Sequence, residues 1–389
     1  MAFSSAARMT ETTRLLRDLV ALPSVNPMGR PLHGPQIFEH QVSAYLEDFL
    51  RGLGVFWQRQ PIAPKRDNIL ARWEHPGAHR TLLLEAHQDT VPAENMVIEP
   101  FGARIESGRL YGRGACDVKG GMAAMLALFA RLVREQPRGA ANVILACTVD
   151  EEHTFLGVQR LVQSALHADA AVVAEPTQLQ IVNAHKGVVR WHLETHGRSC
   201  HSSAPEQGLN AVYRMANVLL AVEQFAEALR TAKVDPLLGP ATLSVGRVEG
   251  GSSVNTVPDL CRIEIDRRVI PGEDPVDAPA QLAAFLRQEL PAEAGFACSE
   301  PWFHAPALSP QGSRELVAVL SDAIDAVCGS HRVTAVPYCT DASTIAEAGI
   351  PAVVFGPGDI ARAHTSDEWV ALDEVEQAAE ILYRMVCAG

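Results

Sequence analysis

The chain has 389 residues, of which 47% are hydrophobic and 20% are charged, an ordinary globular composition for about two domains. Its 33 basic and 46 acidic residues give a formal charge of -13. This charge argues against a nucleic-acid partner, because phosphate binding needs clustered Lys and Arg side chains.

The N-terminal part of the chain predicts an α/β domain. Residues 1–24 carry Arg and Glu where a signal peptide needs an apolar stretch. Apolar spacing then predicts amphipathic helices over Thr10–Ala21 and Gln41–Leu53, and residues 120–135 predict another helix. Between and after them, strands are predicted at 68–73, 80–87, 141–152 and 169–177, and the last three are apolar enough to be buried. Helices alternating with apolar strands are typical of an α/β fold.

The pattern changes after Thr177. Alternating apolar and polar residues predict half-exposed antiparallel strands at 187–197, 241–251 and 259–269, with helices at 209–229 and 277–290. This β-α-β-β-α-β-like order indicates a separate small α+β module. The α/β pattern then resumes with a helix near 313–328, a strand at 350–358 and a helix over Leu372–Val386. We therefore predict a catalytic domain at 1–180 and 294–389, with an inserted module at 181–293.

The cysteines and the apolar runs indicate the cellular location of the protein. Eight Cys are scattered without a CxxC pair, which argues against a Cys-ligated zinc knuckle and predicts reduced thiols in a cytoplasmic protein. The longest apolar run, Met122–Val133, contains Arg131 and is too short to span a bilayer. No membrane partner is therefore expected.

The segment LLLEAHQDTVP ends a predicted buried strand at His87 and Asp89. Because strand side chains alternate, these two point the same way. A metal-bound His needs a carboxylate or carbonyl nearby to fix its tautomer. The pair is thus a candidate ligand with its partner, and an ordinary loop after a strand is the alternative.

Asp117 lies in a Gly-rich loop, LYGRGACDVKGG, directly before a predicted helix. The pattern GxxxxGK[ST] is absent and Lys119 precedes the glycines Gly120 and Gly121, so we reject a phosphate loop. An Asp in a tight loop can instead bridge two metal ions, since each carboxylate oxygen can bind one. Ordinary turn glycines are the alternative.

Three consecutive acids, Asp150, Glu151 and Glu152, follow another apolar strand. Adjacent carboxylates at a buried strand end repel one another and lose hydration, so they indicate a nearby cation. One carboxylate would bind metal, and its neighbour would stay free as a general base for a water molecule. A surface acidic turn is the alternative, which the apolar run disfavours.

Two further segments, AAVVAEPTQ and FGPGDIARAHTSDEW, place Glu175 and His364 after apolar strands. In open α/β sheets, ligands collect at the carboxyl ends of strands. All five segments fall at such ends or in the loops that follow. Together they offer the mixture of oxygen and imidazole ligands that suits zinc.

These five segments, in this order and spacing, resemble the two-zinc amidohydrolase and peptidase family that includes acetylornithine deacetylase, succinyl-diaminopimelate desuccinylase, aminoacylase and glutamate carboxypeptidase. The resemblance runs from LVALPSVNP to AHTSDEWV. It implies a zinc-peptidase-like α/β catalytic domain with an inserted small α+β, ferredoxin-like lid or dimerisation domain. It also implies two Zn²⁺ ions, with Co²⁺ as a substitute.

The resemblance assigns a role to each residue of the predicted centre. One metal would be held by His87, Asp117 and Glu175, and the other by Asp117, Glu152 and His364, so that Asp117 bridges. Asp89 would orient His87, and Glu151 would take a proton from water and pass it to the leaving amine. A cis peptide is expected at Asp117–Val118. The thiol of Cys116 is a candidate extra ligand, although we favour a packing role.

The module also contains segments of the family pattern. GRSCHSSAPEQGLNA resembles a His-Ser motif, which implies that His201 reaches the active site of the partner subunit in a homodimer and donates a hydrogen bond to the oxyanion. GGSSVNTVPDLCRIEIDRRVIPGE resembles the segment whose Asn255 and Arg268 bind substrate. The planar fork of Arg268 suits a carboxylate, and a surface strand Arg is the alternative. CTDASTIAEAGIP resembles the segment whose backbone and hydroxyls, here Ser343 and Thr344, touch the substrate carboxylate.

The resemblance implies hydrolysis of the amide bond of an N-acyl amino acid. A Glu at position 175 looks more like the acyl-amino-acid deacylases, whereas an Asp there looks more like the peptidases. The segments NAHKGVVRW, IDRRVIPGED and FGPGDIARAHTSDEW look most like acetylornithine deacetylase. N-succinyl-diaminopimelate desuccinylase and a metal-dependent dipeptidase or carboxypeptidase are the alternatives, because such families change substrate while keeping their metal ligands. A non-catalytic binding protein on the same fold is a hypothesis of another class, which the intact Glu151 disfavours.

Overall fold

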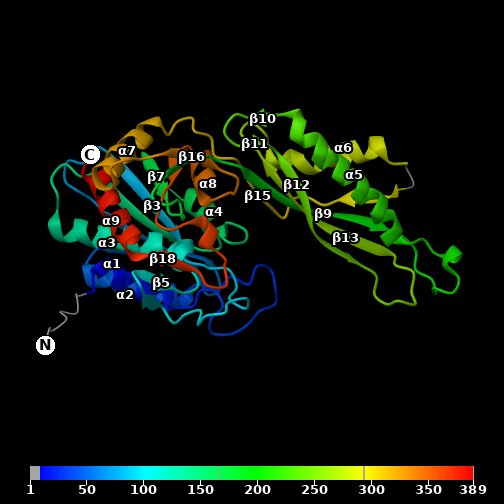
Figure 1. Cartoon of the computed structure of the whole chain (residues 1–389), viewed down its shortest axis with the longest axis horizontal. Helices are drawn as coiled ribbons and strands as arrows, with labels where there is room; N and C mark the ends of the chain where they lie inside the picture. The colour runs from blue at the N-terminus through cyan, green and yellow to red at the C-terminus, as the bar shows by residue number, and fades with distance from the viewer. Residues whose placement is uncertain (1–8, 165, 292–293, 389) are drawn as a thin grey trace. The chain divides into compact units, whose positions relative to one another are not determined.

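A computed structural model describes residues 9–164, 166–291 and 294–388, which form two compact units (Figure 1). The first unit contains the described residues up to Asn183, Pro310–Thr334 and the described residues from Thr340 onward. The second contains Ala184–Ser309, with the gap noted, and Ala335–Cys339. This arrangement confirms the predicted α/β class with an inserted small α+β module.

An eight-stranded sheet has the order β1-β2-β6-β3-β7-β17-β8-β16, and its first six strands lie in the first unit. The parallel centre consists of β6 (Asn142–Thr148), β3 (Thr81–His87), β7 (Ala170–Val173) and β17 (Ala352–Val354). On one side β2 (Arg66–Trp73) and β1 (Phe56–Ala63) are antiparallel, and on the other lie β8 (Ile181–His185) and β16 (Val333–Val336). The parallel centre matters most, because its strand ends carry the predicted site.

Helices on the first unit bury one continuous apolar cluster against this sheet. The contributing helices are α1 (Glu11–Val20), α2 (His40–Leu53), α3 (Gly120–Glu135), α7 (Arg314–Cys328) and α9 (Leu372–Cys387). Two short helices, α4 (Leu156–Val162) and α8 (Asp341–Glu347), contact each other and pack on the sheet outside this cluster. A small sheet of β18 (Trp369–Ala371), β5 (Arg109–Tyr111) and β4 (Arg104–Glu106) completes the unit. The longer predicted helices are confirmed to within a few residues at their ends.

The second unit has the chain order β9 (Gly187–His196), α5 (Ala211–Ala232), β12 (Thr242–Gly250), β13 (Leu260–Val269), α6 (Ala278–Glu289) and β14 (Phe296–Cys298). Its strands are antiparallel in the order β12-β13-β9-β14, and β15 (Phe303–Ala305) also pairs with β9. Figure 1 shows α5 and α6 side by side on this sheet, where they bury an apolar cluster that includes Trp191 and Ile263. The order is that of a ferredoxin-like α+β module.

The extent of the module differs from the sequence boundary at residue 293, because the second unit continues to Ser309. The short strands β14 and β15 give no readable periodicity, and they belong to the module because both pair with β9. The small hairpin of β10 (Val234–Asp235) and β11 (Gly239–Pro240) was not predicted either, because strands of two residues are too short to show alternating polarity. Among the described residues, no helix has both the length and the apolar character needed to span a bilayer.

Candidate metal centre

The carboxyl ends of three adjacent parallel strands bring the predicted ligands together. β3 pairs in parallel with β6 on one side and with β7 on the other. His87 is the last residue of β3, the acids Asp150–Glu152 follow β6, and Glu175 follows β7. Parallel strands end at the same edge of a sheet, so segments far apart in the chain converge there.

Asp117 lies between the two predicted imidazole ligands. Its Oδ1 is 3.1 Å from Nε2 of His87, and its Oδ2 is 3.3 Å from Nε2 of His364. The expected cis peptide at Asp117–Val118 is present. A Cβ at Gly121 would lie only 2.8 Å from Cβ of Ala174, so glycine allows the start of α3 to approach the end of β7 closely. The two oxygens of one carboxylate thus face two different imidazoles.

The remaining acids complete two groups of donor atoms. Nε2 of His364 lies 3.3 Å from Oε1 of Glu152, and Nε2 of His87 lies 4.0 Å from Oε1 of Glu175. His87, Asp117 and Glu152 offer ligand atoms within 4.8 Å of one another, as do His87, Glu151 and Glu175. The five predicted ligands and the predicted base therefore meet in one place.

The electrostatics of this cluster favour a cation. Burial raises the pKa of Glu175 and of Glu151 well above the ordinary carboxyl value, and neighbouring carboxylates raise both further. Burial disfavours the charged form of His364, but hydrogen bonds with Asp117 and Glu152 outweigh it and raise the pKa of His364 to about 11. For Asp117, hydrogen bonds with the two His residues outweigh burial and hold its pKa below the usual range.

These donors fit divalent metal ions. Two imidazoles and several carboxylates meet in a largely buried space, and the carboxylates repel one another unless protons or cations lie between them. Nitrogen and oxygen donors of this kind suit zinc and related metals. Asp117 is placed to serve two ions because each of its oxygens already contacts a different His.

Asp89 orients His87 through its backbone. Nδ1 of His87 lies 2.9 Å from the backbone oxygen of Asp89 and 3.7 Å from its Oδ1. Nδ1 is therefore the nitrogen that carries the proton, which leaves Nε2 free to bind metal. The side chain of Asp89 has another task, because its two oxygens accept the backbone N–H groups of Glu151 and Glu152 at 3.1 Å each.

Glu368, to which no motif of the sequence assigned a role, binds the backbone beside Asp117. Its Oε1 accepts the backbone N–H groups of Cys116 and Asp117 at 3.0 and 3.1 Å, and its Oε2 accepts from Nη1 of Arg113 at 2.6 Å. Both Glu368 and Arg113 are fully buried. Two features of the sequence could have indicated this pair. Glu368 lies in TSDEW, just after His364, and Arg113 lies within the Gly-rich loop.

Cys116 packs beside the centre. Its Sγ donates to the backbone oxygen of Asp359 at 3.3 Å, and burial raises the pKa of its thiol. The described groups of potential metal ligands do not include it. This geometry supports packing, which was the favoured role.

Two predicted residues of the second unit share one loop region. His201 forms an isolated antiparallel bridge with Thr256, and its Nδ1 lies 2.7 Å from Oγ of Ser203. The neighbouring Asn255 accepts the backbone N–H of Ser202 through its own backbone oxygen at 3.0 Å. The imidazole of His201 is exposed.

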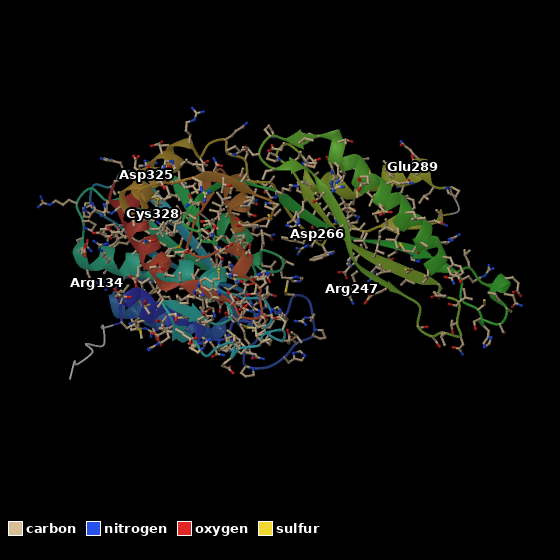
Figure 2. All side chains as sticks on the ribbon, viewed as in Figure 1. Arg134, Arg247, Asp266, Glu289, Asp325 and Cys328 are labelled. Atoms are coloured by element: carbon tan, nitrogen blue, oxygen red, sulfur yellow. The ribbon has the colours of Figure 1, made fainter. Side chains whose placement is uncertain are left out.

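Arg268 lies in β13, where it forms a two-point ion pair. Its Nε and Nη2 donate to the two oxygens of Asp266 at 2.7 and 3.2 Å. Asp266 is labelled in Figure 2. Asp266 also accepts from Nε of Arg190 at 2.8 Å. The side chain of Arg268 is 27% exposed, so the residue is held in place by Asp266 without being buried.

Ser343 and Thr344 lie in α8 of the first unit and are almost completely buried. Oγ of Ser343 donates to the backbone oxygen of Thr340 at 3.2 Å. Asp341, at the start of the same helix, accepts from Thr148 at 3.4 Å, and Thr148 also donates to Glu85. This segment therefore connects to the strand that ends at His87.

Comparisons with known proteins agree with this centre. The sequence pattern of peptidase family M20/M25/M40 matches residues 83–388. The chain belongs to this family. It is 33% identical to acetylornithine deacetylase of Myxococcus xanthus over 362 residues, covering 89% of both chains, and 29% identical to acetylornithine deacetylase of Edwardsiella ictaluri, covering 96% of both.

The fold is shared with solved structures of the same family. The chain superposes on an M20 family metallo-carboxypeptidase from Sulfolobus solfataricus with a TM-score of 0.80 and 21% sequence identity, covering 97% of this chain and 99% of the other. Family membership makes this chain an enzyme that acts on amide bonds.

Proposed function

We propose that the chain is a two-metal N-acyl amino acid deacylase that releases a carboxylate and an amino acid, with N-acetylornithine as its first candidate substrate. The observation that carries the proposal is the carboxylate of Asp117, whose oxygens face His87 and His364 separately. Glu175 and Glu152 supply the outer donors of the two sites. We propose Zn²⁺ as the native metal, with Co²⁺ as a substitute.

Bound there, the two cations would lower the pKa of a water molecule toward neutrality and polarise the amide carbonyl. The protein supplies the proton transfer. Glu151 follows the end of β6, its backbone N–H is held by Asp89, and its carboxyl lies in one group with His87 and Glu175. Glu151 takes the proton from the attacking water and returns it to the leaving amine. His201 donates a hydrogen bond to the oxyanion that forms on the carbonyl.

Arg268 is the proposed carboxylate clamp. Its guanidinium already binds the two oxygens of Asp266 in a fork geometry, which is the geometry that a substrate carboxylate requires. Asn255, Ser343 and Thr344 are proposed as further substrate contacts. Because the side chains of Ser343 and Thr344 are almost fully buried, we assign their contribution to the backbone of α8.

A homodimer through the second unit is part of the proposal. Among the described residues β12 is an edge strand that pairs only with β13. Large apolar side chains near it are exposed, with Val248 at 54%, Leu220 at 62% and Tyr213 at 73%. An unpaired strand edge with exposed apolar groups is a template for association. Sedimentation of the wild-type protein and of Val248→Lys tests this, and a wild-type monomer would contradict it.

A substrate panel tests the function directly. N-acetylornithine, other N-acetyl amino acids, N-succinyl-diaminopimelate and dipeptides are assayed with purified protein supplied with Zn²⁺ or Co²⁺. We expect the highest kcat/KM for an N-acetyl amino acid. The metallo-carboxypeptidase among the structural relatives supports a peptide as the second candidate. Hydrolysis of none of these amides would contradict the proposal. The cytoplasmic location, for which the absence of a CxxC pair among the scattered cysteines is the sequence argument, stays a prediction that cell fractionation would test.

A further inference from the structure

The turn that carries the proposed base and one proposed ligand has no regular secondary structure to hold it. Asp150 has a left-handed backbone with φ of 69°, a conformation that Asp adopts more readily than most residues. Its backbone oxygen accepts the N–H of Phe155 at 2.8 Å. Asp89 accepts the N–H groups of Glu151 and Glu152. The directions of the Glu151 and Glu152 carboxyls therefore depend on how firmly the side chains of Asp89 and Asp150 are held.

Asn26 connects the two aspartates. Its Nδ2 donates to Oδ2 of Asp89 at 2.8 Å and to Oδ1 of Asp150 at 2.9 Å. Its Oδ1 accepts the backbone N–H of Met28 at 2.9 Å, so the network itself fixes the orientation of the amide. The side chain is fully buried. The two N–H groups of the amide donate one hydrogen bond to each of the two carboxylates. An ionised carboxylate at this position could not replace it, because a carboxylate has no hydrogen to donate.

Arg66 provides the positive charge of this network. Its Nη1 donates to Oδ1 of Asp150 at 2.7 Å, and its Nε donates to Oε2 of Glu39 at 3.0 Å. Only 8% of the Arg66 side chain is exposed, and the side chain of Glu39 is fully buried. The guanidinium also stacks on the ring of Phe38 at 5.0 Å. A buried cation in this position offsets the repulsion among Glu39, Asp150 and Asp89.

We propose that Asn26 and Arg66 are positioning residues that fix, through Asp89 and Asp150, the directions of the base Glu151 and the ligand Glu152. The inference rests on the proposed function for the roles of the two glutamates. Neither Asn26 nor Arg66 touches the metal donors themselves, so both act through the turn. Positioning of this kind matters because a displacement of about 1 Å at a reacting group can cost a factor of about one hundred in rate.

Asn26→Asp is the most discriminating variant, because it keeps the shape of the side chain and replaces both donors by a third carboxylate. Asn142→Asp is a matched control. Asn142 is partly buried at the start of β6, where its Oδ1 accepts the N–H of His75 at 2.9 Å. It lies six residues from Thr148 at the other end of the strand, about 20 Å away.

Two measurements separate positioning from a general loss of stability. One is the visible absorption spectrum of the protein loaded with Co²⁺, which reports the geometry of the donors. The other is the division of the kinetic effect between kcat and KM. In Asn26→Asp we expect an altered Co²⁺ spectrum and a kcat lower by about tenfold or more, with KM changed by less than about threefold. Asn142→Asp keeps the wild-type spectrum and kcat. A spectrum and kcat in Asn26→Asp equal to those of the control would overturn the inference.

Arg66 variants keep the test decisive if Asn26→Asp does not fold. Arg66→Lys retains the charge and loses the fork to Glu39, whereas Arg66→Met loses both. We expect the Co²⁺ spectrum and kcat to change in both, and to change more in Arg66→Met. Wild-type spectra and kcat in both variants would overturn the role of Arg66.

The outcome can be told apart from a failure of the proposed function. If the wild-type protein binds Co²⁺ and hydrolyses none of the amides in the panel, the proposed function fails. The comparison of Co²⁺ spectra among Asn26→Asp, Asn142→Asp and the wild type still decides whether the network positions the donors.

Discussion

In the second unit, two proposed substrate-contacting residues, His201 and Arg268, lie at opposite ends of strand β13. His201 pairs with Thr256, just before β13 begins at Leu260, whereas Arg268 lies near the other end of that strand. The eight residue steps from Leu260 to Arg268 span about 26 Å at about 3.3 Å per residue. This distance exceeds the length of a small acyl amino acid. One copy of the chain therefore does not present both side chains to one substrate, and we expect His201 to act in the site of the partner subunit.

Mixed dimers test this arrangement. His201→Ala and Glu151→Gln subunits with different affinity tags are produced together, and the mixed dimer is purified on both tags. If His201 acts in the partner's site, one site carries both changes and the other carries neither. The mixed dimer then has about half of the wild-type kcat per dimer, because the two sites of a symmetric dimer are equivalent before mutation. Each variant alone loses its proton acceptor or its oxyanion donor, with kcat lower by about a hundredfold or more.

The opposite pairing is the control. A subunit with both His201→Ala and Glu151→Gln is combined with a wild-type subunit, which gives every site one change if His201 acts in the partner's site. This dimer is then nearly inactive. If instead the first mixed dimer is as inactive as its parents and the second keeps about half of the activity, His201 acts in the site of its own subunit, which would refute this prediction.

Further predictions concern the metal centre itself. Glu151→Gln keeps both metals by elemental analysis and loses turnover, and more than a tenth of the wild-type rate would contradict its role as the base. Glu152→Ala loses metal in the same analysis, and an unchanged metal content would show that Glu152 is not a ligand. Burial raises the pKa of Glu85, beside Thr148, from the ordinary 4.5 to about 7. The stability that protonated Glu85 contributes to the metal-free protein is present below pH 4.5 and is lost as the pH rises to about 7. The Tm of the metal-free protein therefore falls across this pH range. Added Zn²⁺ is expected to raise Tm more at pH 7 than at pH 5. A metal-induced rise in Tm that is independent of pH would contradict this. Glu368→Gln weakens the hold on the backbone of Asp117 and lowers Zn²⁺ affinity by about tenfold or more in a chelator competition, whereas an unchanged affinity would exclude this role.

Several features of the fold follow from local patterns in the chain. The helices over 120–135 and 372–386 carry apolar stripes long enough to identify, and the strands of the parallel centre are apolar on both faces. By contrast β1, with the sequence FWQRQPIA, has no such signal and is placed by pairing with β2. The strands β14 and β15 have three residues each, so only their pairing with β9 assigns them to the second unit.

The sequence by itself determined which residue types stand after which strands. His87 and Glu175 could be recognised because short polar motifs follow long apolar runs, and Asp117 because its Gly-rich loop directly precedes an apolar helix. Such motifs depend only on neighbouring residues. The tertiary structure alone decided the hydrogen bonds that hold these motifs. Asn26 reaches Asp150 across 124 positions of the chain, and Arg113 reaches Glu368 across 255. Such partners depend on which distant segments the folded sheet brings together. The identity of a side chain therefore does not reveal which distant carboxylate it will contact.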